Sequence, residues 1–255
     1  LPSPIYFQNK ISSRSLPKAS SYSGNNRKIQ QSLLVGGFIN LNPIQQDVLY
    51  KTPLLIRYGG EVYPSLSLQL VSNRLLTNKL FLRSANNDTD FITGINFDDD
   101  WTPTDQQGNV LFKFRGPPGS FPTVSATKII SGNLLPSVFQ SKIRNKAIII
   151  SSNIPHIRSR VLVANKYFYN SAEIHANIVS SILTNQVFSS PQYLKNLDTW
   201  LLVFTGLTLS LILPGMNPRQ IILAAGFFVS TWLIYHSTLI SSTLYITALA
   251  VPVLL

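Results

Sequence analysis

The sequence predicts an α/β or α+β domain with a mixed sheet in residues 1–197, followed by an α-helical membrane segment of three spans in residues 198–255. Composition is the first observation: 45% of the 255 residues are hydrophobic and only 12% are charged, about half the charged share of an average soluble domain. The second is that residues 198–255 contain one acidic and one basic residue, so the net charge of +11 lies in residues 1–197. The third is the alternation of strand-like and helix-like patterns in that first part.

The membrane segment is predicted from three apolar stretches at about residues 199–214, 219–236 and 238–255. With their polar flanks, these stretches approach the roughly 20 residues that a helix needs to cross a bilayer. The intervening residues have the composition of turns. A buried helical hairpin of a soluble protein is the alternative, which we consider weaker because so apolar a sequence is difficult to solvate.

The first elements of the polar part are a loop, a hairpin and a helix. Residues 1–32 are rich in Ser, Asn and Lys and are expected to form a loop. Leu54–Tyr58 and Glu61–Tyr63 flank the pair Gly59-Gly60, and a glycine pair supplies the positive φ that a two-residue hairpin turn requires. A helix of about three turns is expected to begin at Pro64, since apolar residues then recur at helical spacing: Leu66, Leu70, Val71 and Leu75.

The acidic stretch 86–107 is compatible with a calcium site or with a solvated loop. No register places a Glu at the twelfth position that an EF-hand loop requires, so we expect the loop. Val110–Phe114 then has the pattern of a strand. The following Arg115–Gly119, of sequence Arg-Gly-Pro-Pro-Gly, is expected to be a rigid exposed loop, because proline excludes both helix and central strand.

Two helices and a strand are predicted in the remainder of the polar part. Ser125 is placed to cap a short helix that ends at Gly132. The apolar run Ala147–Ile150 is typical of a buried strand. Ser171–Phe188 is predicted to be a helix capped by Ser171 and packed on the sheet through an apolar stripe: Ile174, Ile178, Val179, Ile182 and Leu183.

Few residues in the sequence suggest catalysis. Glu173 and His175 are an acid and an imidazole close in sequence, but two residues apart on a helix they point about 200° from each other and cannot jointly bind one metal ion. There is no cysteine and no phosphate-binding loop or dinucleotide fingerprint. We therefore predict no catalytic residue, no metal site and no cofactor. The guanidinium of Arg115 could bind an anion or pair with backbone carbonyls.

The dispersed basic residues bear on the partners of the chain. Because they form no stripe, contact with anionic lipid headgroups or simple solubility is favoured over nucleic acid. We expect as partners the membrane and an unidentified small ligand or protein, and a homodimer is also compatible with the sequence.

Several stretches of the chain resemble one known family, the CHASE extracellular sensor domain, type two. The most specific is Leu111–Ser125, with the sequence LFKFRGPPGSFPTVS, together with Glu173–Asn177, with the sequence EIHAN. Shorter matches occur in the same order as in the family: Gly37–Asn40, Pro53–Leu55, Tyr63–Leu66, Leu135-Pro136 with Phe139, and Lys142-Ile143.

The resemblance implies a bacterial periplasmic or extracellular sensor, tethered by a preceding membrane segment and followed by three membrane helices and a cytoplasmic cyclase or kinase. The chain would then be a fragment without the N-terminal anchor and the output. It departs from the family pattern between Ser151 and Arg160, where the family usually has a Gly, an Asp and a Thr-Pro, and this places ligand binding by that loop in doubt.

The function expected from the sequence is therefore sensory input and transmembrane signalling, without catalysis, in a multi-pass protein of the plasma membrane whose residues 1–197 lie outside the cytoplasm. One alternative is a membrane-anchored structural or assembly subunit that binds a protein through its basic domain. A membrane-bound hydrolase is the weakest, because no nucleophile and base are paired in the sequence. The candidate ligand or signalling residues are Arg115, Gly116, Pro117, Pro118, Glu173 and His175.

Overall fold

The structure is a computed structural model that describes residues 15–32, 35–41, 49, 51–77, 80–84, 92–97, 100–133, 135–152, 160–162 and 167–188, together with scattered positions between 200 and 237. The chain divides into two compact units, Leu1–Val187 and Phe188–Leu255. The segment between Ser151 and Arg160, where the sequence departs from the family pattern, lies almost entirely outside the described residues. Four aspartates of the acidic stretch also lie outside them: Asp88, Asp90, Asp98 and Asp99.

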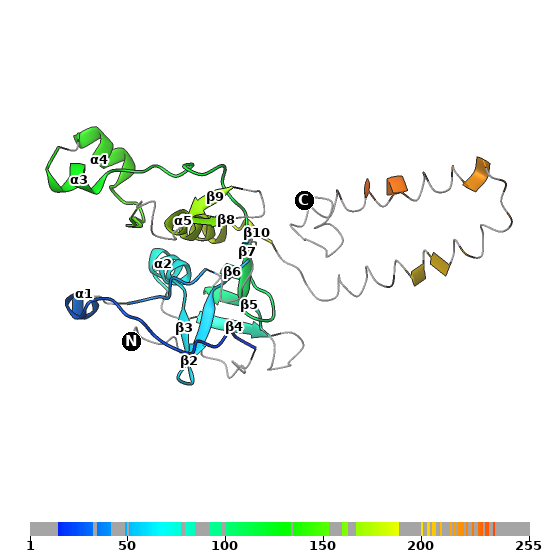
Figure 1. The fold of residues 1–255 in the computed structure, drawn as a ribbon, viewed down its shortest axis with the longest axis horizontal. Coiled ribbons are helices and arrows are strands. Elements are labelled where there is room, and N and C mark those ends of the chain that lie inside the picture. Colours follow the sequence, from blue (N-terminus) through cyan, green and yellow to red (C-terminus); the bar gives the residue numbers. More distant parts are fainter. Residues whose placement is uncertain are drawn as a thin grey trace. The chain divides into compact units, whose positions relative to one another are not determined.

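The first unit mixes short strands with helices (Figure 1). Its helices are α1 (Arg27–Ser32), α2 (Leu66–Leu75), α3 (Ala126–Ile130), α4 (Pro136–Lys142) and α5 (Ser171–Leu183). Its strands are β1 (Thr52–Pro53), β2 (Leu55–Tyr58), β3 (Glu61–Pro64), β4 (Leu80–Ser84), β5 (Ile92–Phe97), β6 (Asp100–Pro103), β7 (Asn109–Phe112), β8 (Arg160–Leu162) and β9 (Phe168–Asn170), and β10 (Val187–Phe188) lies at the boundary between the units.

The strands form several small sheets among the described residues, with the orders β1-β7-β10, β2-β3, β4-β5-β6 and β8-β9. The registered pairs are antiparallel, for example Leu55 opposite Pro64 and Leu80 opposite Phe97. Parallel contacts occur as isolated bridges, between Lys18 and Arg57 and between Phe38 and Ser65. The predicted α/β or α+β class, a domain of helices and sheet, is therefore consistent with this unit.

The β2-β3 hairpin confirms the turn prediction, since Gly59 and Gly60 have φ of +61° and +92°. The helix expected to begin at Pro64 begins two residues later, because Pro64 pairs in β3 and Ser65 is the N-cap, its hydroxyl accepting from the Leu68 backbone N–H at 3.1 Å. Its buried face also differs from the predicted stripe. Val71 is fully buried as predicted, but Leu68, which lies outside the predicted stripe, is fully buried too, and Leu75 is exposed.

Helix α5 is the most fully buried helix among the described residues and packs against α2 (Figure 1). Ile174, Ile178, Val179 and Ile182 are buried in the main core, as predicted, but Leu183 is exposed. The N-cap is Asn170 rather than Ser171. The C-terminus lies earlier than predicted: Asn185 has φ +56°, and the Gln186 N–H returns to the Ser181 carbonyl at 2.8 Å, the pattern of a Schellman C-cap.

Three further predictions of local structure were wrong. Residues 1–32 contain α1, and the chain at residues 17–19 pairs with Arg57 on the edge of β2. The acidic stretch contains β5 and β6 rather than only loop, and Ile92, Ile95 and Phe97 of β5 are buried in the core. The apolar run Ala147–Ile150 is neither strand nor buried. The helix after Ser125 is present as α3, although the Ser125 side chain makes no capping hydrogen bond.

The prediction of three membrane-spanning helices is not supported by the described residues of the second unit. Its described residues have helical backbone in two groups, between 200 and 210 and between 219 and 237. Among the positions that can be described, however, no helix combines the length and the apolar character that crossing a membrane requires. Apolar composition was the basis of the prediction, and composition does not establish a continuous helix of sufficient length.

Candidate functional site

The loop that follows β7 lies along helix α5 and is held there by three polar side chains of the helix. The Ser181 hydroxyl donates to the Lys113 carbonyl at 2.8 Å. The Asn177 Oδ1 accepts from the Arg115 backbone N–H at 2.8 Å, and a Glu173 carboxylate oxygen accepts from the Gly119 N–H at 2.7 Å. We call Glu173, Asn177 and Ser181 the polar ladder.

The spacing of the polar ladder follows from helix geometry. Residues four apart lie on one face of a helix, so positions 173, 177 and 181 form a continuous row along α5. Ile174, Ile178 and Ile182 form a neighbouring row in the core. The same helix therefore anchors the core through one stripe and binds the backbone of a distant loop through the other.

The backbone from Pro117 to Ser120 forms a tight turn. The Ser120 N–H donates to the Pro117 carbonyl at 3.2 Å, and Gly119 has φ +88°. Proline at the second position and a positive φ at the third are the features of a type II turn. Gly119 is therefore the residue whose backbone conformation requires glycine, and its N–H is the one that Glu173 binds.

An aromatic cluster fixes the start of the loop. The rings of Phe114 and Tyr169 have centroids 4.6 Å apart, and those of Phe114 and Phe112 are 4.9 Å apart. The fully buried Tyr169 side chain donates its hydroxyl to the Gly116 carbonyl at 2.8 Å. Burial of the ring and satisfaction of its hydroxyl together position Gly116 relative to β9.

The Arg115 side chain is exposed, and its guanidinium lies over the Phe121 ring with 5.5 Å to the centroid. No carboxylate within the described ranges forms an ion pair with it. Among the described residues, no backbone carbonyl accepts a hydrogen bond from the Arg115 side chain, which stacks on Phe121 instead. A stacked, exposed guanidinium keeps its donors available to an anion, and it does so beside the exposed Pro117 and Pro118.

His175 lies on another face of α5, toward α2. Its Nδ1 is 2.8 Å from the Ser67 hydroxyl, and its Nε2 is 3.3 Å from the Ile39 carbonyl. Because a carbonyl can only accept, we assign the proton to Nε2 and the hydrogen bond at Nδ1 to donation by Ser67. Burial lowers the pKa of His175 from its ordinary value of 6.5, and the hydrogen bond to Ile39 opposes this effect only in part.

A serine hydroxyl bonded to an imidazole raises the question of a catalytic dyad. Ser67 is fully buried within α2 and His175 is almost fully buried, so neither atom can meet a substrate. The second nitrogen of the imidazole is bonded to a backbone carbonyl rather than to the carboxylate that orients the histidine of a triad. The pair is a structural link between α2 and α5.

A small pocket lies among the described residues, and none of the six candidate residues lines it. It is bordered by Leu75, Trp101, Ile182 and neighbouring side chains, and the space open to a water-sized sphere is about 50 Å³. Ligand sites for small molecules are several times larger. Within the same part of the chain, no three His, Asp or Glu side chains are grouped as metal ligands would be.

The structure thus brings together five of the six residues singled out from the sequence. Arg115, Gly116, Pro117 and Pro118 lie in the loop that Glu173 binds, whereas His175 faces α2, in agreement with the divergent directions of Glu173 and His175 expected on a helix. Sequence reasoning missed Asn177, Ser181, Tyr169 and Ser67. The four-residue spacing of the polar ladder could have indicated a polar face on the helix. It could not have identified the loop that this face binds, which is 54 or more residues away in the sequence.

Comparison with known proteins yields one match. The family model described as "CHASE2 domain" matches residues 10–214, which is most of the chain and includes the loop and α5. No curated protein and no solved structure matches the chain.

Proposed function

Since the chain belongs to the CHASE2 domain family, whose members are extracellular sensor domains of bacterial receptors, we propose that it is the input module of a receptor that controls a cytoplasmic cyclase or kinase. In this proposal the chain binds and transmits and does not catalyse. Its sensory role follows from the family, while the output and the route of the signal are proposed.

The observation that carries the proposal is the connection of α5 to three parts of the sensor domain. One face binds the loop 113–119 through the polar ladder, another contacts Ser67 of α2, and a third is buried in the core. Only β10 follows α5 within the described part of the first unit before the second unit begins in the sequence. A displacement of the loop would therefore act on the last helix of the sensor domain.

The exposed face of the loop is the proposed point of contact with the stimulus. Arg115, Pro117 and Pro118 are exposed on a turn whose backbone is held by Glu173 and Tyr169. A ligand or partner that binds one arrangement of this loop better than another shifts the population of the two. Since the loop is hydrogen-bonded to α5 along about two turns, the shift would reach the helix.

The test is the basal output of the full-length receptor with Glu173→Ala. Removal of this carboxylate releases the Gly119 N–H from α5 and should change output while the sensor remains folded, because the contact is at the surface. Glu61→Ala is the matched control, since Glu61 is an exposed acid in the hairpin turn region. Unchanged output in Glu173→Ala, at a protein level and melting temperature equal to the control, would exclude the loop from signalling.

A further inference from the structure

Residues 126–133 and 135–150 expose both apolar and basic side chains, and we call them the α3–α4 surface. Neither α3 nor α4 contains a buried residue. Large apolar side chains are exposed along it, with relative exposures of 86% for Ile130, 67% for Leu135 and 90% for Ile150. Several large exposed apolar side chains within one segment are a feature of interaction sites.

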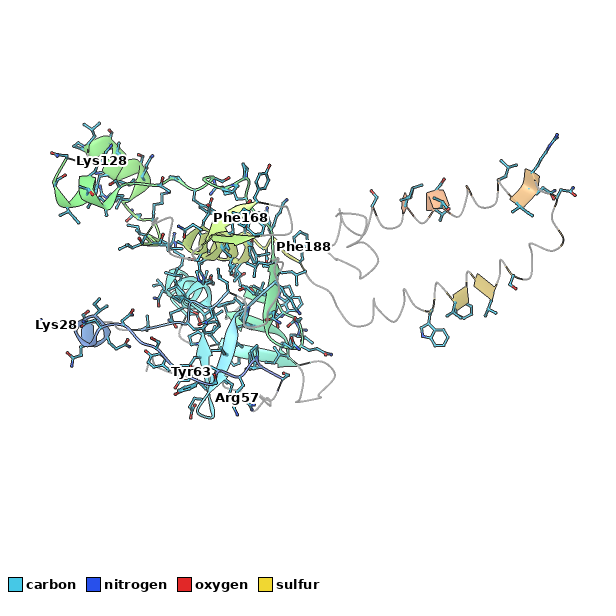
Figure 2. The ribbon with its side chains drawn as sticks, in the orientation of Figure 1. Lys28, Arg57, Tyr63, Lys128, Phe168 and Phe188 are labelled. Atoms are coloured by element: carbon cyan, nitrogen blue, oxygen red, sulfur yellow. The ribbon has the colours of Figure 1, made fainter. Side chains whose placement is uncertain are left out.

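The charge of this region has one sign. Between Asp105 and Glu173 the sequence contains nine Lys and Arg and no acidic residue. Lys128, Lys142, Arg144 and Lys146 belong to the α3–α4 surface and are exposed, and Lys128 is labelled on α3 in Figure 2. The one ion pair within the described ranges, Lys51 with Asp105, lies elsewhere. The cations of this surface are therefore available to an anionic partner.

We propose that the α3–α4 surface docks on an anionic phospholipid bilayer, with its aliphatic side chains in the interface and its cations at the headgroups. Amphipathic segments that lie on membranes combine these two features. The inference concerns attachment of the sensor domain to the bilayer surface, and it requires neither a membrane-spanning helix nor the proposed role of the Arg115 loop.

Three other occupants fit the observations less well. A second copy of this chain would bring two surfaces of the same positive sign together. Single-stranded nucleic acid is bound by stacking of bases on aromatic rings, whereas the most exposed apolar side chains here are Ile and Leu. A protein partner needs a matching shape, and the exposed side chains come from two short helices and an irregular segment. A fluid bilayer adapts to the side chains that contact it and needs no matching shape.

The experiment uses the absence of cysteine from the chain. Ile130→Cys and Ile150→Cys each introduce one thiol for a polarity-sensitive fluorophore in the full 255-residue protein. Leu76→Cys is the matched control, because Leu76 is an equally exposed aliphatic residue, at 89%, at the C-cap of α2. The labelled proteins are titrated with vesicles of phosphatidylcholine alone and of an equimolar mixture with phosphatidylglycerol.

The expected result is a blue shift at positions 130 and 150 with anionic vesicles and none at position 76. Each cation near an anionic surface strengthens binding roughly fivefold. The double variant Lys128→Gln/Lys142→Gln, which removes two cations, should therefore weaken binding to anionic vesicles by roughly 25-fold. Lys28→Gln/Arg74→Gln, which removes the same charge from α1 and α2, should leave it unchanged.

Several outcomes would overturn the proposal. No shift at positions 130 and 150, or an equal shift at position 76, would show that the α3–α4 surface does not contact lipid. Equal binding to neutral and to anionic vesicles would show that the cations do not contribute to binding. A shift that grows with protein concentration in the absence of vesicles would assign the surface to a second copy. Circular dichroism of each variant checks that the substitutions, all at exposed positions, preserve the fold.

Discussion

Asn177 and Arg115 are joined by a hydrogen bond of 2.8 Å between the Asn177 Oδ1 and the Arg115 backbone N–H, across 62 residues of sequence. The Asn177 amide is buried, and its Nδ2 donates to the Glu173 carbonyl one turn earlier at 2.9 Å. This second bond determines the orientation of the amide, so that the oxygen faces the loop. Asn177 is thus a fixed acceptor between the core helix and the loop that carries the exposed cation.

Asn177→Ala should destabilise the first unit by about 1 to 3 kcal/mol, because it leaves the Arg115 N–H without its acceptor. Chemical denaturation monitored by circular dichroism measures the free energy of unfolding. Asn73→Ala is the control, since Asn73 is exposed on α2 and should change stability by less than about 0.5 kcal/mol. Equal effects of the two substitutions would show that the bond does not hold the loop.

Gly119→Ala should cost about 1 to 2 kcal/mol, the penalty of a side chain in left-handed backbone. Its φ is +88°, and the space around an added Cβ is open, so the loss would come from backbone strain rather than from a clash. Asp100→Ala, at an exposed position on β6, is the comparison. A melting temperature lower for Asp100→Ala than for Gly119→Ala would contradict this account of the turn.

His175 should make the stability of the first unit depend on pH. Its pKa is lowered in the folded state, mainly by burial, so the unfolded chain binds the proton more readily. Stability is then complete above the ordinary pKa of 6.5 and falls as the pH decreases below it, by at most about 1.4 kcal/mol per pH unit from this group.

The measurement is the melting temperature between pH 7.5 and pH 5 for the wild type and for His175→Asn. The variant should be less stable than the wild type at high pH, since it cannot reproduce both hydrogen bonds of the imidazole, but its melting temperature should fall less on acidification. Parallel pH profiles would mean that another group is responsible. His156 and His236 are present in both proteins and cancel in the difference.

Ile178→Asp should unfold the first unit or destabilise it by several kcal/mol, because Ile178 is fully buried and an isolated carboxylate there has no partner. Leu183→Asp, five residues later on the same helix and exposed, should fold normally. Thermal melts of the two variants make the comparison. In a full-length receptor, Ile178→Asp should also abolish the response of the output, and a normal response would show that α5 is not the link.

The local patterns that the sequence predicted correctly depend on neighbouring residues. The glycine pair 59–60 specifies its own hairpin turn through positive φ, and the isoleucine stripe of α5 repeats at the helical period. The Arg-Gly-Pro-Pro-Gly loop is specified in the same way, because few backbone conformations are open to it. The family was also accessible from the sequence, because short motifs kept their order over most of the chain.

Which segments contact one another was decided by the tertiary structure alone. The four-residue spacing of Asn177 and Ser181 places them on one polar face of a helix, but what that face binds was decided only because the loop 113–119 lies against α5. Ala147–Ile150 has the composition of a buried strand, yet no partner strand covers it among the described residues. The apolar residues beyond 198 likewise predicted three membrane spans that no described helix supports. Burial is a property of the neighbours that a segment acquires on folding, so composition predicts a preference for burial, and packing determines whether that preference is met.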